Sequence, residues 1–361
     1  MLNNNKKFAL QPFFKNMLRF GVSGIAISVL AFGQIFPDKA AAKDKAEFVI
    51  KYATIAPDNT PWSNHMMRLK KQIEGDSKGR IKMKVFLGGA LGGEVEMIRS
   101  LRRGRIQGFG GSTAAVAEGI GIPELQLLEL PYLFDSLEES DYILDHVVFK
   151  DFQKILKEKG FYLAFWHENG WRNFAASKVE VHTPDDLRKL KMRSQESSVH
   201  LAMWKALGVQ AESIAVPEVL GALKTGMVDG FDNTPLFASA TGWYEGVDHY
   251  IISKHIYQPA IILYSLKFID SLPEDLKKIV IGDPMAEMAW GRKAVREMTE
   301  PLLQNFRDEG IKVYELTEEE KDAFRKLTFP VHKEFESIVG KELLEKVYAA
   351  KKEFALKKEK K

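Results

Sequence analysis

The chain has 361 residues, more than a single hydrophobic core usually supports, so its length favours two lobes. With 45% hydrophobic and 28% charged residues, its composition is that of a globular protein and argues against wholesale disorder. Lys and Arg (52) nearly balance Asp and Glu (49), so there is no basic excess of the kind that binds nucleic acid. The absence of cysteine excludes disulfide scaffolds, thiolate metal sites and thiol nucleophiles.

The first 42 residues have the layout of a secretory signal peptide. Residues 1–19 carry basic side chains and no acid, residues 20–36 are apolar or small and uncharged, and three alanines end the segment. We expect cleavage after Ala42 and a periplasmic location. The alternative is an uncleaved membrane anchor, although an apolar run of about 17 residues is marginal for crossing a bilayer.

Strand-like and helical segments alternate along the rest of the chain. A strand over 47–53 precedes a helix over 60–76, and an alternating strand over 80–86 precedes a helix over 94–103. We also predict a helix over 197–207 and a helix-rich region from about residue 272, with one long helix over 283–309. This alternation predicts an α/β fold with largely parallel sheets.

Residues 96–111 (EMIRSLRRGRIQGFGG) and 218–233 (EVLGALKTGMVDGFDN) resemble each other. Each copy predicts a helix that ends at a glycine, a short apolar strand and a glycine-rich turn. Two similar lobes would then present strand ends to a shared crevice, where open α/β sheets bind ligands. The alternative is a chance likeness between two ordinary α/β units.

Sequence motifs for catalysis are missing. The chain has no phosphate-binding G-x-x-x-x-G-K-[ST] loop, no G-x-S-x-G nucleophile elbow and no H-E-x-x-H metal pair. The glycine-rich segments 88–93 and 108–113 fail the dinucleotide spacing and are better explained as tight turns close to a ligand. We therefore expect no catalytic residues, no cofactor and no metal site.

Two arginines follow strand-like segments, Arg172 after Trp171 and Arg193 after residues 190–192. The fork of a guanidinium can bond both oxygens of a carboxylate, and a deep cleft favours such a pair over a surface position. From residue type alone, a structural salt bridge or an exposed position is the commoner explanation for each. Asn233 ends the segment MVDGFDN and can donate and accept in the same cleft, or it is simply a turn residue.

At these residues the chain resembles a known family, the DctP-type substrate-binding proteins of TRAP (tripartite ATP-independent periplasmic) transporters. The resemblance covers about residues 46–340. Its strongest elements are WRNFAASK (171–178), TPDDLRKLKMRSQES (183–197), ALGVQAESIAVPEVLGALKTGMVDGFDN (206–233) and WYEG (243–246).

The resemblance implies a periplasmic binding protein fold, with two α/β lobes joined by hinge strands and a long helix and closing over one small molecule. It places residues 43–169 and 259–298 in the first lobe, and residues 170–258 and 299–361 in the second. In the family, one arginine pairs with the ligand carboxylate, a second helps to bind or close, and an asparagine contacts the ligand. These roles fall on Arg193, Arg172 and Asn233.

Some positions depart from the family pattern. Where relatives often have an aromatic residue that packs on the ligand, this chain has Val216, and where sialic-acid binders have an acid it has Gly111. We therefore expect a roomier or more apolar site. The residues expected to contact the ligand are Arg193, Arg172, Asn233, Phe231, Glu94, Ser112, Val216 and Trp171.

The sequence thus favours a solute-binding protein, not an enzyme, that captures a small carboxylate-bearing ligand, and the departures above favour a bulky or apolar one. The expected partners are the small four-helix and large twelve-helix TRAP membrane components, and we expect no nucleic acid. One alternative is a periplasmic sensor or carrier of the same fold that presents an apolar ligand to another partner. Another is an exported α/β enzyme, which the lack of a catalytic constellation disfavours. The sequence does not identify the ligand, its affinity or the oligomeric state.

Overall fold

The structure is a computed structural model that describes residues 46–359, all within one compact unit. The predicted signal peptide lies outside the described residues. In the part that the structure describes, no helix combines the length and apolarity needed to cross a membrane.

Nine strands of the described residues form one sheet. Their order is β2-β1-β3-β8-β4-β7-β5-β6, and β9 pairs with β8. The strands are β1 (Phe48–Thr54), β2 (Ile81–Phe86), β3 (Gly108–Ser112), β4 (Phe161–Ala176), β5 (Lys191–Ser194), β6 (Gln210–Ser213), β7 (Gly230–Asn233), β8 (His249–Ser265) and β9 (Lys312–Glu315).

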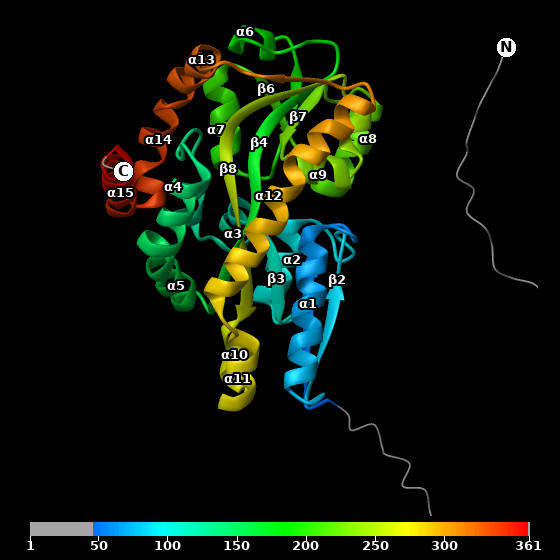
Figure 1. The fold of residues 1–361 in the computed structure, drawn as a ribbon, viewed down its shortest axis with the longest axis vertical. Coiled ribbons are helices and arrows are strands. Elements are labelled where there is room, and N and C mark those ends of the chain that lie inside the picture. Colours follow the sequence, from blue (N-terminus) through cyan, green and yellow to red (C-terminus); the bar gives the residue numbers. More distant parts are fainter. Residues whose placement is uncertain (1–45, 360–361) are drawn as a thin grey trace, which may run out of the picture. The chain divides into compact units, whose positions relative to one another are not determined.

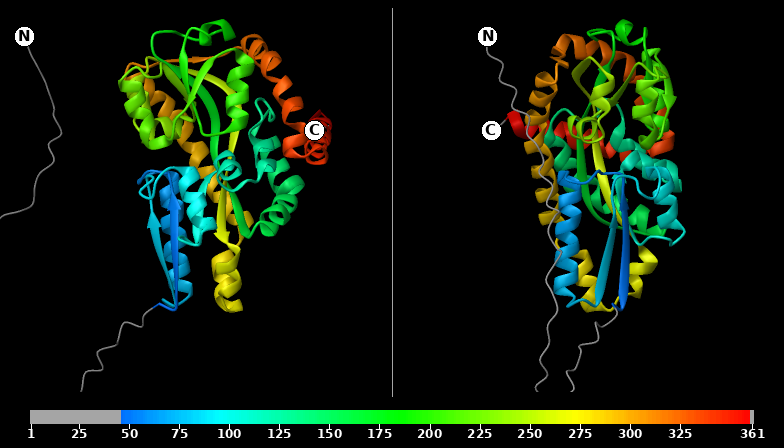
Figure 2. Two further views of the ribbon diagram at one scale, coloured as in Figure 1. Left: turned by 180° about the vertical axis from the view of Figure 1, so that it is seen from behind. Right: turned by 90° about the vertical axis from the view of Figure 1, so that its right-hand side faces the viewer.

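The sheet consists of two parallel strand sets joined by two long antiparallel strands. The first strand set is β1, β2 and β3, and the second strand set is β5, β6 and β7. Strands β4 and β8 pair along nearly their whole length and run from one set to the other (Figures 1 and 2). The predicted parallel pairing holds within each set. The joining strands are antiparallel because β4 carries the chain from the first set to the second and β8 carries it back.

Helices cover both strand sets, and the longest, α12, crosses over β4 and β8 (Figure 1). The α-helices are α1 (Pro61–Asp76), α2 (Glu94–Arg102), α3 (Thr113–Ile120), α4 (Leu137–Tyr142), α5 (Phe149–Glu158), α6 (Pro184–Leu187), α7 (Ser198–Leu207), α8 (Val219–Lys224), α9 (Pro235–Ala240), α10 (Leu266–Ser271), α11 (Glu274–Ile281), α12 (Pro284–Asp308), α13 (Glu318–Thr328), α14 (Pro330–Val339) and α15 (Lys341–Glu359). Shorter helical turns are η1 (Pro123–Glu129), η2 (Ile143–Val148), η3 (Val216–Glu218) and η4 (Trp243–Gly246).

Helix α1 shows why the sequence predicted its ends well. The Thr60 hydroxyl accepts a hydrogen bond from the Ser63 N–H, the Ser63 hydroxyl accepts one from the Thr60 N–H, and Pro61 occupies the first helical position. These local contacts satisfy backbone groups that the helix itself leaves free. The predicted start and end therefore agree with the structure.

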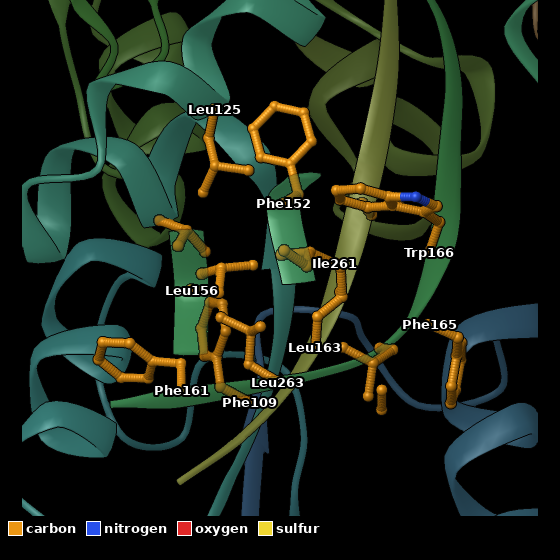
Figure 3. Packing of buried hydrophobic residues seen from close by; sticks show 14 of the residues in the cluster. Phe109, Leu125, Phe152, Leu156, Phe161, Leu163, Phe165, Trp166, Ile261 and Leu263 are labelled. Atoms are coloured by element: carbon orange, nitrogen blue, oxygen red, sulfur yellow. The ribbon is translucent and has the colours of Figure 1, made fainter. Parts of the chain in front are cut away.

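The largest hydrophobic core surrounds the first strand set and the adjoining ends of β4 and β8 (Figure 3). Two smaller cores lie around the second strand set. The C-terminal helices α14 and α15 bury Phe335 and Val347 in the large core, although we expected residues 299–361 in the second lobe. The lobe boundaries themselves stay a prediction.

The two similar sequence segments adopt the same local structure. Helices α2 and α8 are each followed by a glycine with positive φ, Gly104 at 71° and Gly226 at 69°. Strands β3 and β7 follow, and each bears a fully buried phenylalanine, Phe109 or Phe231, directly after its first glycine. The local geometry thus supports the two-copy interpretation.

The glycine that opens β7 is required by close packing. A Cβ atom at Gly230 would clash with the backbone oxygen of Ala175 on β4, and backbone cannot move away cheaply. We predict that Gly230→Ala destabilises the protein by about 1–3 kcal/mol, as overpacking does. Urea unfolding measures this, with Gly75→Ala in α1 as the control, because a Cβ atom there meets nothing within 4 Å. Equal stability of the two variants would contradict the packing argument.

Candidate functional site

A small cavity lies where strands of both sets end. Thr54 ends β1, Gly111 precedes the last residue of β3, Arg193 lies near the end of β5 and Asn233 ends β7. The cavity volume is about 30 Å³. It is lined by Thr54, Ile55, Ala56, Trp62, Glu94, Gly111, Asn169, Arg172, Arg193, Gln195, Val216, Asn233, Phe237 and Gln258. Carboxyl ends of parallel strands are where α/β sheets bind ligands.

Arg193 is a buried cation with no carboxylate partner in the described part of the chain. Its side chain is 1% exposed, its Nε donates to the Ile214 carbonyl at 2.9 Å, and no acid lies within 4.0 Å. Burial, followed by the charge of Arg172, lowers the pKa of Arg193 to about 10. The two Nη groups are therefore left for a ligand anion, since a buried charge needs a counter-charge.

Arg172, by contrast, is fully occupied by protein groups. Its Nε donates to Asp232 Oδ2 at 2.6 Å, and its Nη2 donates to the Asp232 carbonyl at 2.5 Å. Its Nη1 donates to the side-chain oxygens of Gln195 and Gln258, both at 3.0 Å. Arg172 lines the cavity, but its hydrogen bonds go to Asp232, Gln195 and Gln258 and hold these neighbouring side chains in place. Its predicted role as a ligand contact stays a prediction.

The two glutamines extend this wall across the site. Gln195 Nε2 donates to Ser112 Oγ at 2.7 Å, which joins the end of β3 to the residue that follows β5. Gln258 Nε2 donates to Gln195 Oε1 at 2.9 Å and to the buried Glu129 at 2.7 Å. This polar network fixes the side chains around the cavity.

Glu94, at the start of α2, is buried next to Ser112, the last residue of β3. The Ser112 backbone N–H donates to its Oε1 at 2.9 Å, and the Ser112 hydroxyl lies 3.3 Å from its Oε2. Burial raises the pKa of Glu94, and the nearby charge of Glu129 adds to that shift. Asn233 uses its side-chain oxygen to accept from the Thr234 N–H at 2.8 Å.

The structure brings five of the eight predicted residues to the cavity wall: Glu94, Arg172, Arg193, Val216 and Asn233. Ser112 lies behind them, bonded to Glu94 and Gln195. Phe231 and Trp171 do not line this cavity. Phe231 is fully buried and packs on Trp243, because alternate residues of β7 point to opposite faces of the sheet. Trp171 lies in a separate groove and packs on Tyr257.

Six polar or aromatic residues of the cavity wall were not among the predicted contacts: Thr54, Trp62, Asn169, Gln195, Phe237 and Gln258. Gln195 directly follows β5, the strand that bears Arg193. The rule that ligands bind at the carboxyl ends of strands could therefore have predicted it. Asn169 and Gln258 come from the middle of β4 and β8, and Asn169 sits at a register shift between those strands. A bulge of this kind changes the direction in which a side chain points, and the residue types in the sequence do not predict it.

A larger groove, about 610 Å³, lies between α12, α13 and the middle of β4 and β8. Its half-buried arginine, Arg296, is already hydrogen-bonded to Asp141 and Glu168. The groove therefore lacks the free buried charge that distinguishes the smaller cavity. Within residues 46–359, no three His, Asp or Glu side chains gather as metal ligands.

An α/β fold with two parallel strand sets and a small cavity at the strand ends is typical of solute-binding proteins. The model of the DctP family, described as bacterial extracellular solute-binding protein, family 7, matches residues 52–338, and the chain belongs to this family. Its members are binding proteins, which agrees with the expectation that the chain is not an enzyme.

Three relatives illustrate the match. The sugar acid binding protein DctPAm of Advenella mimigardefordensis, in complex with galactonate, is 31% identical with a TM-score of 0.81, over 84% of this chain and 98% of that one. A TRAP periplasmic solute-binding protein of Polaromonas bound to D-erythronate is 26% identical with a TM-score of 0.79, over 84% and 98%. The C4-dicarboxylate-binding periplasmic protein DctP of Rhodobacter capsulatus is 30% identical, over 84% of this chain and 90% of the relative. These likenesses confirm the predicted family and fold class.

The Arg172–Asp232 pair gives a prediction about stability and pH. Burial alone would raise the pKa of Asp232, but the Arg172 charge and the hydrogen bonds from His255 and Arg172 hold it well below its usual value. A depressed carboxyl pKa stabilises the fold above the unfolded-state pKa, and this stabilisation is lost as the pH falls, between about pH 5 and pH 1.

We predict that Asp232→Asn lowers the free energy of unfolding at pH 7 by about 3–5 kcal/mol, because Arg172 is left buried and unpaired. The variant should then lose less further stability on acidification than the wild type. Urea unfolding at pH 7 and at low pH measures both effects. Asp275→Asn is the control, since its 2.6 Å pair with Arg80 is exposed and should matter little. Similar effects of the two substitutions would contradict the argument.

Proposed function

We propose that this protein captures a small organic anion through its carboxylate and delivers it to the membrane subunits of a TRAP transporter. The buried guanidinium of Arg193, with two Nη groups free of protein acceptors, is the observation that carries the proposal. Related proteins were solved with galactonate and D-erythronate, both carboxylates. The partners would be the small four-helix and the large twelve-helix membrane components.

Capture follows from the position of Arg193 between the two strand sets. A ligand carboxylate would meet the guanidinium while the cleft is open, and closure would exclude water. Exclusion of water strengthens the ion pair, because the effective dielectric falls. The ligand shifts the open–closed equilibrium only by its extra affinity for the closed form.

The expectation of a roomy or apolar site stays a prediction, and the composition of the cavity wall offers an argument for a different ligand. The cavity volume is small, and eight of the fourteen lining residues are polar. Val216 does replace an aromatic residue, but Phe237 and Trp62 still line the same cavity. A compact, polar anion is therefore the better candidate.

We further propose export to the periplasm with removal of residues 1–42. The basic, apolar and small-residue order of that segment supports this, and relatives are periplasmic binding proteins. We predict that the protein from the periplasmic fraction of an expressing bacterium begins at Lys43. Intact-mass spectrometry checks this, and a membrane-bound protein of full-length mass would contradict it.

The two arginines should respond oppositely to the same substitution. We predict that Arg193→Gln abolishes carboxylate binding but leaves the ligand-free protein at least as stable as the wild type, because a buried unpaired cation is removed. Arg172→Gln should instead cost about 3–5 kcal/mol of stability, since it leaves Asp232 unpaired.

Calorimetric titration with galactonate, D-erythronate and succinate measures binding, and ligand-free urea unfolding measures stability. Arg188→Gln, a change at an exposed arginine, controls for the loss of one positive charge. Binding by Arg193→Gln within about twofold of the wild type would rule out the carboxylate clamp, since a lost charged hydrogen bond has a larger effect.

A further inference from the structure

The cavity offers one free positive charge. Arg172 and Arg193 are the cations that line it, and Arg172 is paired with Asp232. An incoming monoanion can therefore be neutralised by Arg193. A second carboxylate of the same ligand would be buried with no cation to receive it, and burying an unpaired charge costs several kcal/mol.

Glu94 adds a carboxylate to the same wall. Burial raises its pKa, but the hydrogen bonds from Ser112 lower it and fix both oxygens as acceptors, which favours the ionised form. Ser112 Oγ accepts from Gln195 Nε2 at 2.7 Å and from the Ala115 N–H at 3.2 Å. The single hydroxyl hydrogen of Ser112 is thus directed at Glu94 Oε2. Because the Ser112 N–H also donates to Oε1, both carboxylate oxygens of Glu94 receive hydrogens from the protein.

The hydrogen bonds of Asn169 and Asn233 likewise determine which of their side-chain atoms remain free for a ligand. Asn169 Nδ2 donates to Gln258 Oε1 at 3.1 Å, which leaves its oxygen as an acceptor for a ligand. Asn233 Oδ1 accepts from the Thr234 N–H, which leaves its Nδ2 as a donor. The wall thus combines donors suited to one carboxylate, from Arg193 and Asn233, with acceptors suited to hydroxyls, from Glu94 and Asn169.

Gly111 makes room for this acid. A Cβ atom at position 111 would lie 2.5 Å from the Phe109 ring and 2.7 Å from Glu94 Oε1. Glycine at this position therefore leaves room for both the Phe109 ring and the Glu94 carboxyl group. The chain has Gly111 where sialic-acid binders have an acid, but Glu94 of α2 places a carboxyl group on the same cavity wall.

We infer that the site selects a compact hydroxylated monocarboxylate and rejects dicarboxylates, with Glu94 as the residue that sets this specificity. The inference rests on the proposed function, since it takes the Arg193–carboxylate contact as given. A ligand hydroxyl donates a hydrogen bond to Glu94, and a bond to a charged acceptor is stronger than one between neutral groups. A ligand carboxylate at neutral pH has no hydrogen to donate and meets repulsion instead.

Three four-carbon acids of similar size distinguish the effect of ligand hydroxyls from the effect of a second carboxylate. D-Erythronate has one carboxylate and three hydroxyls, butanoate has one carboxylate and no hydroxyl, and succinate has two carboxylates. Galactonate adds a longer hydroxylated acid. We expect the better of the two hydroxylated acids to bind the wild type at least about 100-fold more tightly than succinate or butanoate, because unpaired polar groups in a site reject analogues strongly.

The variant Glu94→Gln tests the residue itself, because it removes the charge at nearly constant shape. Affinity for the preferred hydroxylated acid should fall about 10- to 100-fold, and the discrimination against succinate should shrink. Glu96→Gln, on the exposed face of the same helix, is the matched control and should bind like the wild type. Thermal unfolding of each variant establishes that it is folded.

The outcomes are distinguishable. Succinate or butanoate binding as tightly as the hydroxylated acids, with loss of binding in Arg193→Gln, would overturn the specificity inference and leave the carboxylate proposal standing. Unchanged selectivity in a folded Glu94→Gln variant would also overturn it. If the wild type binds none of the four acids, the proposed function fails and the inference falls with it.

Discussion

The candidate site depends on one buried positive charge, Arg193, which has no carboxylate partner among residues 46–359 and lies over the Trp243 ring. Most buried arginines in proteins are paired, as Arg172 is with Asp232 and Arg292 is with Asp145 here. Arg193 is buried, its two Nη groups have no hydrogen-bond acceptor among residues 46–359, and this burial lowers its pKa. Such an arrangement is a poor way to stabilise a fold and a good way to attract an anion.

The wall around Arg193 is held in place by groups that do not themselves need a ligand. Arg172, Asp232, Gln195 and Gln258 satisfy one another through short hydrogen bonds. The network includes a bond between Gln195 and Ser112, so it joins both strand sets at the cavity. A wall fixed in advance spends less binding free energy on ordering side chains when a ligand arrives.

The two similar helix–strand units explain how one architecture produces a two-sided site. Each ends in a strand whose buried phenylalanine anchors it in a core, and each leaves a small or polar residue at the cavity. The first unit contributes Gly111 and the second Asn233. Glycine at position 111 leaves room for the Phe109 ring and for the Glu94 carboxyl group from α2.

The sequence by itself determined the elements, the family and the key cation. Local signals such as the Thr60 cap and the glycines after α2 and α8 act within a few residues, so they can be recognised without the fold. The family motif pointed to Arg193, although residue type alone favoured an ordinary salt bridge.

Only the tertiary structure decided which residues share the cavity and which groups remain free. The expectation of a roomy or apolar site stays a prediction. The structure shows that Arg172 is paired with Asp232 whereas Arg193 has no such partner among the described residues. Phe231 lies in the core, and Asn169 and Gln258, from the middle of β4 and β8, line the cavity. The physical reason is that hydrogen-bond partners and charge pairs are set by contacts between residues far apart in the chain, which no local pattern records.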